Sequence, residues 1–172
     1  MFIATERTRE LMLEHRIGER LPPQLARLEE RLAGEMDEAE RGPAEELLAE
    51  GRHLLAALPG LRRVYPDVTF ERRLTLRGSG RRAEVLCLGG GHTASDAFVH
   101  LPDDRVALMG DLLLVGVPPL TVHGDAREWR RIVAEVRALD VERFVPGHGP
   151  VCGPAELAPL DDHLALAAAP AG

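Results

Sequence analysis

The chain has 172 residues, of which 45% are hydrophobic and 28% charged, so a packed core is feasible and wholesale disorder is not expected. The net charge is −7, whereas a duplex-binding protein carries a basic footprint, so we expect no nucleic-acid partner. Aromatic residues make up only 3%, too few for the stacking platforms that bind single-stranded nucleic acid.

Cysteine usage and hydropathy indicate the compartment. Cys87 and Cys152 lie far apart and form no Cys-x-x-Cys pair, which argues against a disulfide framework and favours a reducing compartment. The longest apolar stretch near the N-terminus, residues 2–4, is far too short for a signal peptide or a membrane span. Residues 112–120 are apolar too, but one glycine and two prolines interrupt them. We therefore expect a cytoplasmic protein with no membrane partner.

The chain is predicted to open inside a secondary-structure element. Residues 1–4 have the pattern of the end of a strand, after which Thr5 can cap a helix. Chain termini usually trail off in loose polar residues, so this opening is unusual.

Residues 18–60 are rich in Glu, Arg, Leu and Ala and predict a charged helical insert of two helices. The Pro-Pro pair at residues 22–23 should open the first helix, and the Gly-Pro pair at residues 42–43 should separate the two. A Pro-Gly pair at residues 59–60 should end the second helix. Such a pair is either a solvated helical layer or a lid over a site.

The pattern then changes from helical to alternating. Residues 68–76 alternate apolar and polar side chains, which predicts one half-buried strand. Three further strands are predicted at residues 83–88, 97–101 and 105–109, with a hairpin between the last two.

The last third of the chain mixes helices with one short strand. Asp125 can cap a helix whose apolar face includes Trp129, residues 143–145 predict a strand, and residues 155–168 predict a final helix. Together these elements predict the α/β class, with a largely antiparallel run of strands in the middle.

Three residues that can bind a metal share one local design. Each of His92, Asp111 and His148 directly follows a glycine at the end of an apolar strand. Glycine lets the backbone turn sharply, so the next side chain projects from the edge of the sheet. Each motif alone is also typical of an ordinary turn, but three of the same form favour a metal site. Imidazole and carboxylate ligands together suit zinc, iron or manganese.

These motifs resemble those of the metallo-β-lactamase-fold hydrolases. The resemblance lies in Gly-His-Thr-Ala-Ser-Asp at residues 91–96, Gly-Asp at residues 110–111 and Pro-Gly-His-Gly-Pro at residues 146–150, and it is close over residues 85–151. It implies two packed β-sheets with helices outside and metals at one edge. For this chain it implies a partial αββα sandwich with a helical insert after the first helix.

The resemblance also implies a role for each residue. His92 would be a histidine of the first metal, Asp111 the carboxylate that bridges two divalent metals, and His148 a histidine of the second. Zinc is the expected metal, with iron or manganese as alternatives. Asp111 stands where some zinc β-lactamases place a Cys, and Asp there is the pattern of the glyoxalase II-like hydrolases and their broad relatives. A metal-activated hydroxide, oriented by Asp111, would attack an ester, thioester, lactam or phosphoryl bond of a small-molecule substrate.

Three more residues are candidates for supporting roles. Thr93 and Asp96 can orient His92 through hydrogen bonds, as metal-bound histidines usually require, or they can simply cap a turn. His123 follows two prolines in a loop that can border the site, where it either contacts substrate or is a solvated loop residue.

The leading motif of the family, His-x-His-x-Asp-His, has no counterpart in this sequence. Only His15 and His53 precede His92, and neither has a His or Asp partner at the required spacing. We therefore expect residues 1–172 to be the C-terminal portion of one metallo-β-lactamase-like domain, inactive as an isolated chain. The alternative is a non-catalytic binding or interaction protein with a half-fold and a vestigial metal site, which could pair with a second copy of itself.

Overall fold

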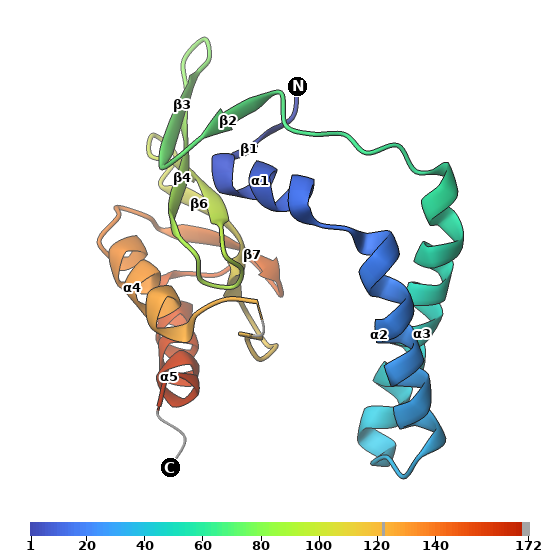
Figure 1. Ribbon diagram of the computed structural model, residues 1–172. Coiled ribbons are helices and arrows are strands. Elements are labelled where there is room, and N and C mark those ends of the chain that lie inside the picture. Colours follow the sequence, from blue (N-terminus) through green and yellow to red (C-terminus); the bar gives the residue numbers. More distant parts are fainter. Residues whose placement is uncertain (122, 170–172) are drawn as a thin grey trace. The chain divides into compact units, whose positions relative to one another are not determined.

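The computed structural model describes residues 1–121 and 123–169, which form two compact units (Figure 1). One unit comprises Met1–Arg9 with Pro66–Gly172, and the other comprises Glu10–Tyr65. Helices and two sheets are both present, so the predicted α/β class is confirmed. Within the described residues, no helix combines the length and the apolarity that a bilayer span requires.

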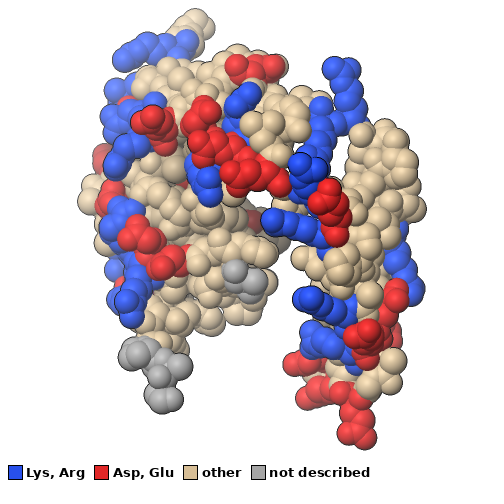
Figure 2. Space-filling model, in the orientation of Figure 1, with Lys and Arg blue, Asp and Glu red and all other residues tan. Residues whose placement is uncertain are grey.

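Charged side chains of both signs lie on the face of the molecule that Figure 2 shows. Figure 2 shows Arg in blue interleaved with Asp and Glu in red on the face in view. Some arginines pair with carboxylates: Arg105 bonds to Asp140 and Glu142, and Arg130 donates to Asp161 at 2.8 Å.

The helical unit contains α2 (Ile17–Ala33) and α3 (Glu38–Ala57), and their boundaries differ from the prediction. The prolines at residues 22–23 lie inside α2 rather than at its start, and the Gly-Pro pair at residues 42–43 lies inside α3 rather than between the helices. Asp37 gives the physical reason: its side chain accepts a hydrogen bond from the Ala39 N–H at 3.1 Å and starts α3 before the proline.

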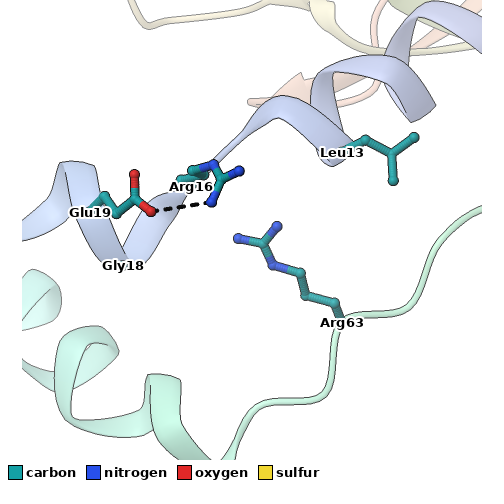
Figure 3. A pocket seen from close by; sticks show the side chains of 5 residues that line it. All are labelled: Leu13, Arg16, Gly18, Glu19 and Arg63. Atoms are coloured by element: carbon teal, nitrogen blue, oxygen red, sulfur yellow. Dashed lines mark hydrogen bonds and ion pairs between the residues drawn. The ribbon is translucent and has the colours of Figure 1, made fainter.

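A hollow of about 390 Å³ lies within the helical unit (Figure 3). Its lining residues are Leu13, Arg16, Gly18, Glu19 and Arg63. Arg16 donates to Glu19 across 3.4 Å, and the Arg63 guanidinium points toward the same space. The residues predicted to carry chemistry belong to the other unit.

Gly51 of α3 is in tight contact with Leu25 of α2. A Cβ at Gly51 would lie 2.3 Å from Leu25 Cδ2, whereas a Cβ at Gly42 on the same helix would meet nothing within 4 Å. We expect Gly42→Ala to raise the free energy of unfolding by about 1 kcal/mol through helix propensity. Gly51→Ala should instead lower it by about 1 kcal/mol, because overpacking outweighs that gain. Urea denaturation followed by circular dichroism measures both, and equal stabilisation by the two would contradict the tight contact.

Two sheets lie in the larger unit. The small parallel sheet pairs β1 (Ile3–Thr5) with β2 (Val68–Phe70). The five-stranded sheet has the order β3 (Arg73–Arg77), β4 (Arg82–Gly89), β5 (Asp96–Leu101), β6 (Val106–Leu114) and β7 (Arg143–His148). Its strands are antiparallel except for the parallel pair of β6 and β7.

The single strand predicted at residues 68–76 is wrong. The strand β2 ends at Phe70 and a second strand, β3, begins at Arg73. The two strands belong to different sheets, because β2 pairs with β1 and β3 pairs with β4. The alternation of side chains is the same in both parts, so the periodicity does not reveal a change of partner. The first helix, α1 (Glu6–Glu14), begins where expected, because Thr5 Oγ1 accepts from the Thr8 N–H at 2.9 Å.

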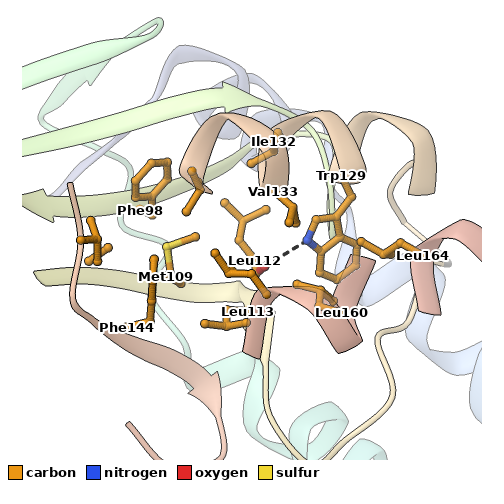
Figure 4. Packing of buried hydrophobic residues seen from close by; sticks show 14 of the residues in the cluster. Phe98, Met109, Leu112, Leu113, Trp129, Ile132, Val133, Phe144, Leu160 and Leu164 are labelled. Carbon is orange, nitrogen blue, oxygen red and sulfur yellow. Dashed lines mark hydrogen bonds between the residues drawn. The ribbon is translucent and has the colours of Figure 1, made fainter. Parts of the chain in front are cut away.

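The core lies between one face of the five-stranded sheet and two helices, α4 (Ala126–Arg137) and α5 (Leu157–Ala167). Figure 4 shows Trp129 and Ile132 of α4 and Leu164 of α5 packed over strand residues such as Phe98. All four side chains are essentially fully buried. This packing fixes the first turn of α4 against the sheet, which matters for the site.

The opposite face of the same sheet carries a row of apolar side chains across all five strands. In register order the row is Leu74, Val85, Val99, Leu108 and Val145. These side chains are partly exposed, and Leu108 is 39% exposed although the residues flanking it in β6 are buried. The two faces of the sheet therefore differ clearly in burial.

Candidate functional site

His92 lies in the loop that joins β4 to β5. The Gly91 carbonyl before it accepts from the Asp125 N–H at 3.1 Å, which ties the loop to the start of α4. The His92 ring meets the Trp129 indole edge-on, with centroids 5.5 Å apart and planes at 72°. A Cβ at Gly91 would lie only 3.0 Å from Trp129 Cγ, so glycine is what lets the loop approach the helix this closely.

The sequence predicts Asp111 after the end of a strand, but the structure places it inside β6. β6 continues to Leu114, and its pairing with β7 shifts register between Leu108 and Gly110 and again between Gly110 and Leu114. Gly110 has a φ of +52°, which glycine adopts without strain. A bulge of this kind redirects the next side chain, and so the glycine still places Asp111.

His148 is the last residue of β7, so this strand also runs further than predicted. Its carbonyl accepts from the Val115 N–H at 2.9 Å, which holds the end of β7 beside β6. Gly147 before it is tightly confined, because a Cβ there would lie 2.2 Å from Asp111 Oδ1. The close approach of the two strands brings His148 to Asp111.

The structure brings His92, Asp111 and His148 together, with the carboxylate between the two imidazoles. His92 Nε2 lies 3.7 Å from Asp111 Oδ2, and His148 Nε2 lies 3.5 Å from Asp111 Oδ1. Both distances are too long for hydrogen bonds. Two donors bonded to one zinc at about 2.1 Å in a tetrahedral arrangement lie about 3.4 Å apart. The distance from each histidine Nε2 to its nearest Asp111 oxygen is therefore close to that expected for two ligands of one ion, and the two histidines face different oxygens.

The donor set suits divalent ions but is incomplete for a catalytic centre. Within residues 1–121 and 123–169, no group of three or more His, Cys, Asp or Glu side chains is placed to hold a metal ion. A catalytic zinc usually has three protein ligands, and here each imidazole pairs with one carboxylate oxygen. His92 Nδ1 is buried and has no hydrogen-bond partner among the described residues. Metal-bound histidines normally donate from this second nitrogen.

Thr93 and Asp96 stabilise the loop that carries His92. Asp96 Oδ2 accepts from the N–H groups of Gly91 and Thr93 at 2.7 and 3.0 Å, and the Thr93 hydroxyl donates to Asp96 Oδ1 at 2.6 Å. These bonds fix the backbone on both sides of His92. The arrangement is that of a turn cap, one of the two expectations for these residues, and it acts on the histidine through the main chain.

His123 lines a pocket of about 300 Å³ beside this loop. The other lining residues are Gly90, Thr93, Ala94, Gly124, Asp125 and Glu128. Asp125 caps α4 as predicted, since its carboxylate accepts from the N–H groups of Glu128 and Arg127. These bonds hold the pKa of Asp125 below its ordinary value.

Trp129 is a site residue that the sequence pattern assigned only to the apolar face of a helix. Its indole Nε1–H donates to the Leu112 carbonyl at 3.0 Å, one residue after Asp111, while its ring meets His92. Its position four residues after the capping Asp125 places it in the first turn of α4. That spacing is the only signal in the sequence for its location.

Comparison with known proteins gives one family. The family model described as the metallo-beta-lactamase superfamily matches residues 15–148. Similar solved structures include a metallo-beta-lactamase from Pontibacter korlensis, with 29% identity and a TM-score of 0.55 over 65% of this chain and 54% of that chain. Another is the metallo-beta-lactamase FIM-1 from Pseudomonas aeruginosa in its mono-zinc form, with 20% identity and a TM-score of 0.55 over 71% of this chain and 55% of that chain. At that lower identity the likeness shows the fold alone.

The match is partial in length. This chain spans little more than half of the length of those structures. Among curated proteins, none matches significantly.

Proposed function

The chain belongs to the metallo-beta-lactamase superfamily. We propose on this basis that it is part of a metal-dependent hydrolase and that His92, Asp111 and His148 are its metal ligands. The observation that carries the proposal is the position of the Asp111 carboxylate between two imidazoles, at 3.7 and 3.5 Å. Zinc is the proposed metal, with iron or manganese as alternatives, because imidazole and carboxylate donors suit all three.

The three side chains have distinct proposed roles. His92 and His148 would bind the ions through Nε2, and Asp111 would bind them through its carboxylate, whose two oxygens face different imidazoles. Divalent ions bound there would supply a hydroxide at neutral pH and stabilise a developing oxyanion. Asp111 would also orient the nucleophile by accepting a hydrogen bond. The target would be an ester, thioester, lactam or phosphoryl bond, and the Asp at position 111 favours a glyoxalase II-like enzyme.

His123 is proposed to contact the substrate. It lines the pocket of about 300 Å³ beside the loop that carries His92, and this volume suits a small-molecule group. The neighbouring Asp125 carboxylate would favour a neutral or cationic group at that position.

The alternative is a non-catalytic binding or interaction protein with a vestigial metal site. The observation that favours it is the lack of any metal-holding group of three or more ligands among the described residues. With two donors for each position, the chain by itself should bind ions weakly and turn over little or no substrate.

Zinc titration by calorimetry tests the proposal on wild type, His148→Ala and the matched variant His163→Ala on α5. We expect wild type and His163→Ala to bind zinc equally, and His148→Ala to bind at least about tenfold more weakly. A panel of one ester, thioester, lactam and phosphoester, assayed with zinc, then reports hydrolysis. Binding without hydrolysis would support the vestigial site, and failure of wild type to bind zinc would overturn the metal-dependent function.

A further inference from the structure

We propose that Trp129 is a positioning residue that holds His92 and Asp111 in fixed relation to each other; the inference rests on the proposed function of those two residues. Trp129 is 0% exposed and makes two specific contacts. Its Nε1–H donates to the Leu112 carbonyl at 3.0 Å, and its ring meets the His92 imidazole at a centroid distance of 5.5 Å. One side chain thus contacts both segments that carry these candidate ligands.

The first contact fixes the strand that carries Asp111. A buried indole N–H needs a hydrogen-bond partner, and the Leu112 carbonyl is the one it has. This carbonyl belongs to the residue immediately after Asp111, close to the bulge at Gly110 where the pairing of β6 with β7 is irregular. The hydrogen bond therefore holds β6 where the ladder constrains it least.

The second contact fixes the imidazole. His92 Nδ1 has no hydrogen-bond partner among the described residues, so packing must orient the ring. Packing against Trp129 takes the place of the hydrogen bond that usually orients a metal-binding histidine.

The backbone around Trp129 leaves little room for adjustment. The Trp129 N–H donates to the Asp125 carbonyl at 2.9 Å, and the Asp125 N–H donates to the Gly91 carbonyl at 3.1 Å. The first turn of α4 and the loop before His92 are therefore linked directly. A change in the indole should then move both candidate ligands, and not merely weaken the core.

Two variants separate the contacts. Trp129→Phe keeps an aromatic ring near His92 but removes the donor to Leu112, and Trp129→Leu removes both. We expect zinc affinity to fall about threefold in Trp129→Phe and at least about tenfold in Trp129→Leu. Val136→Ala is the matched control, since Val136 is equally buried and lies about two turns further along α4. It should lower stability and leave zinc affinity unchanged.

A second measurement uses the metal-free protein. The indole ring current should shift the His92 side-chain resonances in NMR spectra, and both Trp129 variants should change them while Val136→Ala does not. If wild type binds no zinc, the proposed function fails but these resonances still decide the positioning role. Unchanged His92 resonances in Trp129→Leu, or an equal loss of zinc affinity in Val136→Ala, would overturn the inference.

Discussion

Asp111→Asn should lower zinc affinity by about a hundredfold or more and abolish any hydrolysis that the chain performs. Asn has nearly the same shape, so the fold should be retained, but it carries no charge and has only one oxygen. In the wild type each carboxylate oxygen faces a different imidazole, at 3.7 and 3.5 Å. The amide can therefore serve at most one of the two positions. Calorimetric zinc titration and hydrolysis assays measure the two effects.

Asp140→Asn is the matched control for this variant. Asp140 is a 78% exposed carboxylate that bonds to Arg105, so its replacement removes a surface ion pair of little energetic value. Zinc affinity should be unchanged. If Asp111→Asn binds zinc as tightly as Asp140→Asn does, Asp111 is not the shared ligand.

The sequence predicts those elements that have strong local signals. The Asp125 cap and the apolar face of α4 are both present as expected, because a capping carboxylate and a period of 3.6 residues act within one helix. Residues 68–76 show where local reasoning fails. One alternating pattern serves two strands in different sheets, and only long-range pairing decides where the chain changes partner. The same holds for Pro43, which α3 accommodates once Asp37 has started the helix.

For the candidate site, the glycine before each predicted ligand was the informative signal. It marks His92, Asp111 and His148 as residues at sharp backbone features, and the structure brings their side chains together. The sequence could not indicate how each glycine works. Gly110 forms a bulge inside a strand, whereas Gly147 gives room for a neighbouring carboxylate. Both depend on β6 lying beside β7, a contact between segments that are distant in sequence.

Gly147 leads to the second large prediction. A Cβ at this position would lie 2.2 Å from Asp111 Oδ1, 2.7 Å from the Gly110 carbonyl carbon and 2.9 Å from the Asp111 nitrogen. Two of these atoms belong to the backbone of β6, so they cannot move away as a flexible side chain could. We expect Gly147→Ala to lower the free energy of unfolding by about 1–3 kcal/mol and zinc affinity by at least about tenfold.

Gly153→Ala separates these effects from the general cost of replacing a glycine in this region. A Cβ at Gly153 would meet nothing within 4 Å, so stability should change by less than about 0.5 kcal/mol and zinc affinity should be unchanged. Zinc titrations at a temperature where both variants are fully folded make the comparison valid. Because the new methyl group pushes on Oδ1, the oxygen that faces His148, the loss of affinity should exceed any loss due to unfolding. A Gly147→Ala protein that is destabilised but binds zinc normally would show that Oδ1 is not a ligand, and Asp111 would then serve only the position beside His92.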